Sequence, residues 1–278
     1  MAEQMITPLA SPVVSVEEVV RDPDAFRVVD VRWYLDGRSG REAFQSGHLP
    51  DALFCDLGEA LAGHGDPTAG RHPLPLPEAF AAALGSLGIA MNDRVVAYDD
   101  TGGGTAGRLV WMLRAIGQSA AILDGGLAAW TGPLSTAEAV PTPVTRVAAP
   151  WPATLLEHLE DLDALDAATI VLDARAPERY SGSTEPVDSR AGHIPAALNL
   201  PWTTLLESDG KLASPDDLRA DFASLGLESA DDLVASCGSG VTACMLLIAA
   251  EYAGLGRGRL FVPSFSGWSS STREVATR

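Results

Sequence analysis

Short apolar runs alternate along the whole chain with segments of helical periodicity. The runs at Val28-Val29 and Ile170 to Leu172 are rich in β-branched residues, and each leads to an aspartate. Segments such as LPEAFAAALGSLG and SPDDLRADFASLG have a helical pattern, and Pro77 and Pro215 stand where such helices begin. This alternation is typical of βα units around a mainly parallel sheet, so the pattern predicts an α/β fold.

The same succession of signals occurs twice, more than a hundred residues apart. Each copy has a strand ending in Asp-x-Arg, a Gly-His-aliphatic-Pro turn, a strand followed by a Gly-rich loop and a helix, and a closing tryptophan. Four signals in one order indicate an internal duplication. The matched positions are Asp30 with Asp173, Arg32 with Arg175, His48 with His193, and Trp130 with Trp268.

The stretch between the two copies is rich in Pro, Thr and Ala, which is the composition of an extended connection. We therefore predict a first domain over residues 1–140, a linker over 141–152 and a second domain over 153–278. When the two loops are aligned at Ala106 and Ala243, Asp100 of the first copy stands opposite Cys237 of the second. This alignment predicts that only the second domain is catalytic.

The composition is that of a globular protein and narrows the choice of partners. Of the 278 residues, 46% are hydrophobic and 20% charged, which excludes a disordered tail, a coiled coil and a collagen-like chain. The formal net charge of -18 would repel a nucleic-acid backbone over most of the surface. We expect a small-molecule substrate and no nucleic acid.

The amino-terminal residues MAEQMITPLASP contain no basic region followed by an apolar stretch. The sequence also has no run approaching the roughly 18 apolar residues of a membrane-spanning helix. We therefore expect a cytoplasmic protein that does not enter the membrane.

Only one of the three cysteines stands in a setting that activates a thiol. Cys237 ends an apolar strand and is followed by Gly238-Ser239-Gly240 and a helix from about Val241. Such a loop directs backbone N–H groups into one small bowl, and the start of the helix favours the thiolate form of the cysteine. This predicts a nucleophilic Cys237, whereas Cys55 and Cys244 lie in apolar stretches and are expected in the core.

Phosphate-ester chemistry uses a similar loop but is disfavoured here. Cysteine-dependent phosphatases place an arginine six residues after the cysteine, where it binds the phosphoryl oxygens. Position 243 is alanine. Cysteine spacing also indicates neither a disulfide framework nor a zinc site, because the number is odd and no CxxC pair occurs.

The doubled Asp-x-Arg, Gly-His-aliphatic-Pro and tryptophan signals, together with CGSGVTA at 237–243, resemble the two-domain rhodanese family of sulfurtransferases. The resemblance covers nearly the whole chain and implies two tandem rhodanese-like domains, each a mainly parallel sheet flanked by helices. The loop is similar to that of 3-mercaptopyruvate sulfurtransferases. Members that prefer thiosulfate usually carry basic residues there, whereas Gly238 and Ser239 bring no cation into this loop.

The resemblance implies a persulfide mechanism without a metal or organic cofactor. The Cys237 thiolate would take sulfur from 3-mercaptopyruvate, release pyruvate and pass the sulfur to cyanide or to a thiol such as a thioredoxin-like partner. Ser239 and His72 match residues that assist proton movement, and Arg179 and Arg190 match residues that hold the substrate carboxylate. The loop N–H groups would stabilise the persulfide anion, which assigns substrate contacts to Gly238, Gly240, Val241 and Thr242.

Two departures from the family pattern bear on this hypothesis. Gly58 stands where the resemblance places an acidic partner of His72, so that partner is Asp56 or Glu59, or is absent. Pro263 stands in the closing segment 261–268 in place of a glycine and removes a backbone donor. The alternatives are a thiosulfate:cyanide sulfurtransferase and a sulfur-relay module that accepts a persulfide without turnover.

The histidines and aspartates that recur in both copies are expected to be structural. His48 and His193 occupy matched turns, but only one copy has the cysteine. By the same reasoning, Asp30 and Asp173 are expected to bond local backbone or the nearby arginines.

Overall fold

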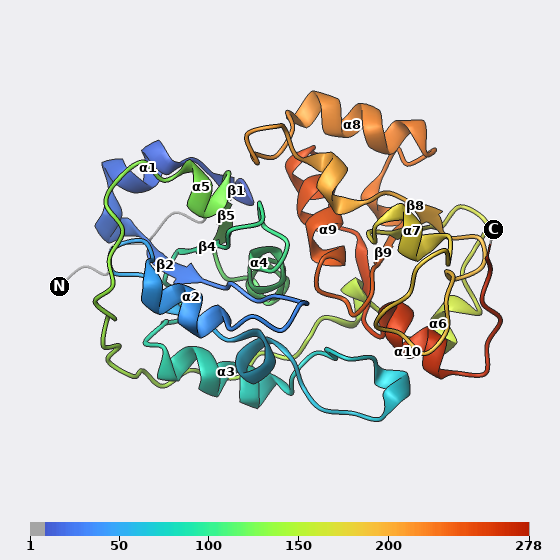
Figure 1. Ribbon diagram of the computed structural model, residues 1–278, viewed down its shortest axis with the longest axis horizontal. Coiled ribbons are helices and arrows are strands. Elements are labelled where there is room, and N and C mark those ends of the chain that lie inside the picture. The colour runs from blue at the N-terminus through green and yellow to red at the C-terminus, as the bar shows by residue number, and fades with distance from the viewer. Residues whose placement is uncertain (1–8, 278) are drawn as a thin grey trace. The chain divides into compact units, whose positions relative to one another are not determined.

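The computed structural model describes residues 9–277 and divides into two compact units (Figure 1). The first unit comprises the chain up to Ala60 together with Pro77–Trp151, and the second comprises Leu61–Leu76 and the chain from Pro152. Most of the residues from which the absence of a targeting signal was inferred, 1–8, lie outside the described part.

The first unit contains a five-stranded, wholly parallel sheet with the strand order β1-β5-β4-β2-β3. Its strands are β1 (Val13–Val14), β2 (Arg27–Asp30), β3 (Leu53–Phe54), β4 (Val95–Tyr98) and β5 (Ala120–Leu123). Its helices are α1 (Val16–Arg21), α2 (Gly40–Ser46), α3 (Pro77–Ser86), α4 (Ala106–Ala115) and α5 (Gly126–Ala129), with short helical turns η1 (Pro23–Ala25) and η2 (Leu57–Leu61).

The second unit repeats this topology with the order β6-β10-β9-β7-β8, again wholly parallel. Its strands are β6 (Leu156–Glu157), β7 (Ile170–Asp173), β8 (Leu198–Asn199), β9 (Leu233–Ser236) and β10 (Arg259–Phe261). Its helices are α6 (Leu159–Leu162), α7 (Pro177–Tyr180), α8 (Pro215–Ser224), α9 (Ala243–Tyr252) and α10 (Ser264–Ser270), with the turns η3 (Pro67–Ala69), η4 (Ala153–Leu155), η5 (Trp202–Leu205) and η6 (Ala230–Asp232).

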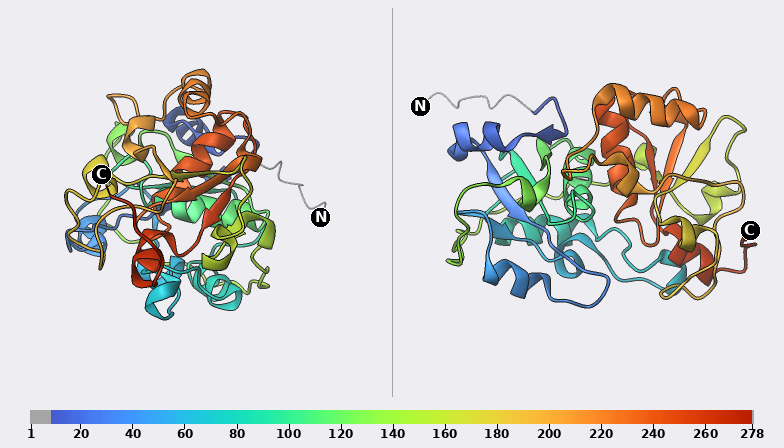
Figure 2. Two further views of the ribbon diagram at one scale, coloured as in Figure 1. Left: turned by 90° about the vertical axis from the view of Figure 1, so that its right-hand side faces the viewer. Right: turned by 45° about the horizontal axis from the view of Figure 1, so that its top comes forward.

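The identical strand orders confirm the prediction of two tandem, mainly parallel α/β domains. Both helix starts expected at prolines are also present, since α3 begins at Pro77 and α8 at Pro215. The Ser214 side chain accepts the Asp217 N–H at 3.2 Å and so satisfies one of the amides that a helix start leaves without a partner. Helix α8 packs on α9 (Figure 2).

Each sheet is buried against its own apolar cluster. In the first unit, Phe44, Phe54 and Tyr98 pack with the aliphatic residues of the sheet. In the second, Phe261 and Trp268 pack together with their ring centroids 6.4 Å apart. The strand centres read as continuous apolar runs because a parallel sheet covered on both faces leaves no side exposed to water.

The segment 61–76 packs with the second unit, although it lies within the range predicted for the first domain. Glycines permit this contact. A β-carbon at Gly70 would stand 2.4 Å from the Pro263 carbonyl oxygen, and one at Gly267 would stand 2.5 Å from the Thr68 carbonyl oxygen. The Arg71 N–H donates to Ser266 Oγ at 3.0 Å. These contacts carry the residues after Gly70 to the loop that follows β9.

Within residues 9–277, no helix has both the length and the apolar character needed to cross a membrane.

Candidate active site

The Cys237 thiol lies at the carboxyl end of β9, the strand that pairs with β7 through Asp173 and Ser236. The residue is buried, with 2% of its surface exposed. The Gly240 N–H points at its sulfur, with nitrogen and Sγ 3.1 Å apart. A backbone N–H aimed at sulfur stabilises a thiolate, and it would equally stabilise a persulfide anion.

The loop after Cys237 is held from outside by α10. Phe265 donates its N–H to the Cys237 carbonyl at 2.9 Å, and Ser266 donates to the Gly238 carbonyl at 2.8 Å. The φ of Gly240 is +79°, a left-handed conformation that residues with a side chain rarely adopt. Backbone hydrogen bonds from α10 and the left-handed Gly240 therefore hold the loop in this conformation.

Val241 and Thr242 form the entry to α9. Their carbonyls accept the Cys244 and Met245 N–H groups at 3.1 and 3.0 Å, so their own N–H groups belong to the first turn of the helix. This is the loop-to-helix junction expected from CGSGVTA. Cys244 is fully buried within α9, and burial raises the pKa of Cys55 in the first unit to about 12, in keeping with core roles for both.

His72 and Ser239, the two residues expected to assist proton movement, form a hydrogen-bonded pair. His72 Nδ1 lies 2.8 Å from Ser239 Oγ, although 167 residues separate them in sequence. Both belong to the second unit, because the segment 61–76 packs there. Asp56, one of the two carboxylates considered as a partner of His72, belongs to the first unit, where it accepts the Glu59 N–H at 3.1 Å.

The guanidinium groups of Arg71 and Arg179 lie against Gly238. Arg71 belongs to the segment 61–76, and Arg179 belongs to α7. A β-carbon at position 238 would stand 3.0 Å from Arg71 Nη2 and 3.4 Å from Arg179 Nη1. The loop residues Gly238 and Ser239 bring no cation of their own, and the two guanidiniums reach the loop from other segments. A β-carbon at this position would press on the Arg71 guanidinium, which would have to shift by a few tenths of an ångström.

The two arginines are anchored by buried carboxylates. Asp188 accepts a hydrogen bond from Arg71 Nη1, and Arg179 Nη2 donates to both Asp188 and Glu185 at 2.8 Å. Burial raises the pKa of Asp188, while Arg71 and Arg179 oppose that shift. Burial also acts to raise the pKa of Glu185, but hydrogen bonds from Arg179 and from two amides outweigh it and leave that pKa lowered.

Arg190 lies outside this cluster, contrary to its expected place at the substrate carboxylate. Its guanidinium donates to four backbone carbonyls at and after the end of α10, at distances of 2.7 to 2.9 Å. The carbonyls at a helix end lack partners within the helix, and arginine is well suited to satisfy them. We therefore assign Arg190 a structural role. The four carbonyls are those of Trp268, Ser269, Ser271 and Arg273.

The first unit carries the equivalent loop with an aspartate in place of the cysteine. Strand register pairs Asp30 with Tyr98 in one sheet and Asp173 with Ser236 in the other, which makes Asp99 the counterpart of Cys237. The Asp99 carbonyl accepts the Leu127 N–H at 2.8 Å, just as the Cys237 carbonyl accepts that of Phe265.

The alignment of Asp100 with Cys237 is therefore wrong by one residue. The loop from Asp99 to Ala106 is one residue longer than the loop from Cys237 to Ala243, and an alignment made from the helix end carries that difference to the strand end. Asp100 instead accepts the Tyr34 hydroxyl at 2.6 Å, and burial together with this bond raises the pKa of Tyr34 to about 12.

The other doubled signals form matching structural contacts in both units. Arg32 donates to Asp30 and to the Gly47 carbonyl, and Arg175 donates to Asp173 and to the Gly192 carbonyl, in each case with a carbonyl distance of 2.8 Å. The equivalent histidines each bond the carbonyl of the aromatic residue on which they stack, His48 that of Phe44 and His193 that of Tyr180, and His48 also bonds the Ala137 carbonyl at 3.2 Å. These contacts agree with the structural roles expected for the pairs.

Pro263 leaves the closing turn intact because the turn uses its carbonyl. The Gly267 N–H donates to the Pro263 carbonyl at 3.0 Å, and Ser266 Oγ donates to the same oxygen at 3.2 Å. Ser264, at a φ of +50°, accepts the Cys237 N–H at 3.2 Å. The turn thus still supports the loop, through the Pro263 carbonyl and the Ser264 hydroxyl.

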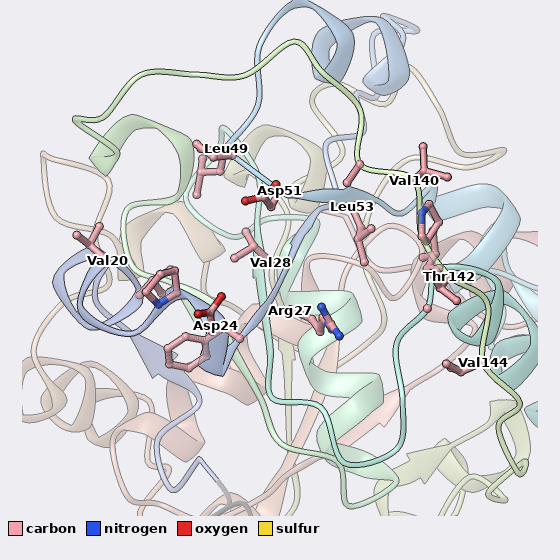
Figure 3. Close-up of a pocket in the computed structure, with 18 of the residues that line it drawn as sticks. Val20, Asp24, Arg27, Val28, Leu49, Asp51, Leu53, Val140, Thr142 and Val144 are labelled. Atoms are coloured by element: carbon pink, nitrogen blue, oxygen red, sulfur yellow. The ribbon is translucent and has the colours of Figure 1, made fainter.

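Each unit contains a cavity. One of about 450 Å³ is in the second unit beside Arg71 and Asp188, and the segments around Gly63, Gly70 and Ser266 line it. The other, of about 690 Å³, is in the first unit, where mainly aliphatic residues such as Leu49, Leu53 and Val140 line it (Figure 3). It contains none of the predicted site residues. Over residues 9–277, no group of three or more His, Cys, Asp or Glu side chains is placed to hold a metal ion.

Arg71 is the site residue that the sequence analysis did not single out as a substrate ligand. It adjoins His72, so the motif GRHPLP was the available signal. Its role depends on contacts with Asp188 and with Ser266, which are 117 and 195 residues away. No local pattern reports such contacts.

Comparison with known proteins identifies relatives along nearly the whole chain. The family model described as the rhodanese-like domain matches residues 15–133 and 152–271. SseB of Mycobacterium tuberculosis, provisionally named a thiosulfate sulfurtransferase, is 37% identical over 264 residues, covering 92% of this chain and 93% of the relative. The 3-mercaptopyruvate sulfurtransferase of Rattus norvegicus is 37% identical over 253 residues, covering 86% of this chain and 84% of the relative.

A solved structure extends the similarity to three dimensions. SseA from Escherichia coli, described with the rhodanese fold of 3-mercaptopyruvate sulfotransferases, superposes with a TM-score of 0.79 at 31% identity, covering 90% of this chain and 97% of SseA.

Proposed function

The chain belongs to the rhodanese family, and from that membership we propose that this sulfurtransferase moves sulfur from 3-mercaptopyruvate to a thiol acceptor through a persulfide on Cys237. The observation that carries the proposal is the setting of the Cys237 sulfur: the Gly240 N–H points at it, and the two guanidiniums of Arg71 and Arg179 lie against the next residue. A donor with an anionic end and a sulfur a few atoms away matches this arrangement.

In the first step the Cys237 thiolate attacks the donor sulfur, and a sulfur–sulfur bond forms as the carbon–sulfur bond breaks. The bonding electrons pass to the carbon as an enolate, which takes up the proton of the donor thiol and becomes pyruvate. Cys237 is left as a persulfide anion near the Gly240 N–H. No external oxidant or reductant is required.

The pair of Ser239 and His72 is suited to move that proton. A hydroxyl 2.8 Å from an imidazole nitrogen can accept a proton on one side and release one on the other. We propose that this pair transfers the proton from the donor thiol to the enolate carbon. Arg179 and Arg71 hold the donor carboxylate, as charged guanidiniums commonly hold carboxylates.

In the second step a thiolate acceptor attacks the outer sulfur of the persulfide and restores the Cys237 thiolate. We propose a thiol acceptor such as a thioredoxin-like dithiol, with cyanide as an alternative acceptor. The location in the cytoplasm stays a prediction.

Thiosulfate is the second candidate donor, because the two guanidiniums at Gly238 can donate hydrogen bonds to the anionic end of either donor. Steady-state assays with each donor, following pyruvate from one and thiocyanate from the other, test the proposal. A higher kcat/KM for 3-mercaptopyruvate is the expected result. Lack of turnover with both donors would contradict the proposal and favour a relay that accepts persulfide from a partner.

A further inference from the structure

We propose that Asp188 is a positioning residue that sets the charge of the donor accepted at this site, favouring a donor with one negative charge over a donor with two. This inference rests on the proposed function and adds to it a determinant of specificity. It concerns a carboxylate that touches neither the thiol nor the loop backbone, and that acts through the two arginines it binds.

The position of Asp188 gives it control over both cations at once. Its two carboxylate oxygens divide between them, since Oδ1 accepts from Arg71 and Oδ2 accepts from Arg179. A β-carbon at Gly238 would lie 3.0 Å from Arg71 Nη2, and 3.4 and 3.7 Å from the Nη1 and Nη2 atoms of Arg179. Asp188 therefore fixes two guanidiniums that both lie against Gly238.

Burial makes the charge of Asp188 effective. Its side chain is 1% exposed, so water and salt screen its interactions little. Arg71 is 30% exposed and lies on the wall of the cavity of about 450 Å³, which gives small anions access to this end of the site. The charge of Asp188 therefore offsets the positive charge of the guanidiniums that a ligand approaches.

The balance of charge at Gly238 is nearly even. Two guanidiniums, Arg71 and Arg179, are matched by two buried carboxylates, Asp188 and Glu185. Arg175 lies next to Glu185, but it forms its closest ion pair with Asp173. Such a site offers hydrogen bonds in a planar fork with little net positive charge, which suits a carboxylate.

A dianion is penalised in the same place. The second negative charge of thiosulfate gains little from a neutralised cluster and is repelled by both carboxylates, while the single carboxylate of 3-mercaptopyruvate needs only the fork. Removing the charge of Asp188 leaves a surplus of one positive charge. Because Coulomb energy scales with the ligand charge, this surplus favours the dianion more than the monoanion.

The test compares kcat/KM for 3-mercaptopyruvate and for thiosulfate in the full chain carrying Asp188→Asn. We expect kcat/KM for 3-mercaptopyruvate divided by kcat/KM for thiosulfate to fall by roughly tenfold or more, because one unit charge acts at short range in a partly buried site. Asp163→Asn serves as the control, because Asp163 also forms an ion pair with an arginine of the second unit but is 56% exposed. Its ratio is expected to match that of the wild type.

A second measurement separates charge from folding. Inhibition by sulfate and by acetate is measured in the same variants and in Glu185→Gln, which removes the other carboxylate of the cluster. Tighter binding of sulfate relative to acetate in Asp188→Asn, or in Glu185→Gln if Asp188→Asn fails to fold, supports the inference.

Equal changes for both donors and both inhibitors, in variants that keep the wild-type melting temperature, would show that Asp188 only holds the arginines in place and would overturn the inference. Failure of the wild type with both donors would instead refute the proposed function.

Discussion

Asp99 and Cys237 occupy the same position in the two repeats, each at the end of the central strand and at the start of a Gly-rich loop. In the first repeat the Asp99 carboxylate accepts four loop amides at 2.8 to 2.9 Å, so the protein's own anion fills the bowl of N–H groups. In the second repeat the Gly240 N–H of the equivalent loop points at the Cys237 sulfur. One loop thus serves as a structural element in one unit and as a candidate active site in the other.

Asp99→Ala is expected to destabilise the protein without changing its chemistry. Loss of the carboxylate leaves several buried amides without an acceptor, which typically costs about 2–4 kcal/mol of unfolding free energy in total. Denaturant unfolding measures the loss, and kcat per folded molecule should stay unchanged. Asp100→Ala is the matched control with a smaller expected loss of about 1 kcal/mol, because Asp100 accepts one hydroxyl from Tyr34. Equal losses in the two variants would argue against the assignment of Asp99.

Cys237→Ser is expected to lower kcat/KM by on the order of 10³-fold or more, because a hydroxyl at neutral pH is a far weaker nucleophile than a thiolate and cannot store sulfane sulfur. Pyruvate release reports the loss. Cys55→Ala is the control, since burial raises the pKa of the Cys55 thiol to about 12 and keeps it protonated at neutral pH. Activity of the serine variant within tenfold of the wild type would remove Cys237 from the mechanism.

Ser239→Ala and His72→Ala are each expected to lower kcat with 3-mercaptopyruvate by about 10²-fold, because they share one hydrogen bond and one proton-transfer role. The double variant should lose little more than either single variant, since groups that act as a unit are not additive. The kcat values of the wild type, the two single variants and the double variant are compared. If the loss in the double variant equals the product of the two single fold-losses, the two residues act independently.

Arg179→Ala and Arg190→Ala should separate substrate binding from support of the fold. Arg179→Ala is expected to raise KM for 3-mercaptopyruvate by roughly tenfold or more with a smaller change in kcat, because a charged hydrogen bond to the carboxylate is lost. Arg190→Ala should lower the melting temperature by several degrees and leave KM near the wild-type value, since its four bonds go to backbone carbonyls. A reversed outcome would restore Arg190 to the substrate site.

The doubled motifs made the fold and the reactive cysteine predictable from sequence. The Asp-x-Arg and Gly-His-aliphatic-Pro signals are local, and each forms its contacts within its own repeat, as the bonds of Arg32 and Arg175 show. CGSGVTA likewise encodes its own conformation, because a strand, two glycines and a helix start determine where the amides point.

What could not be predicted depends on contacts between distant segments. Arg71 reaches Gly238 only because the segment 61–76 packs on α10. Arg190 does not lie at the predicted substrate site because its guanidinium binds the backbone carbonyls of Trp268 and of residues that follow it. The sequence did not indicate at which end of the first loop the added residue lies. The strand register determines this, because it makes Asp99, and not Asp100, the residue that follows β4.

The persulfide on Cys237 is the central claim, and a single-turnover experiment tests it most directly. The protein is incubated with 3-mercaptopyruvate in the absence of an acceptor, pyruvate is quantified, and the intact mass and peptide masses are measured. We predict one pyruvate released per chain and one added sulfur atom, located on Cys237 and removed by a later thiol. Pyruvate release with Cys237 unmodified, or sulfur located on Cys55 or Cys244, would contradict the account.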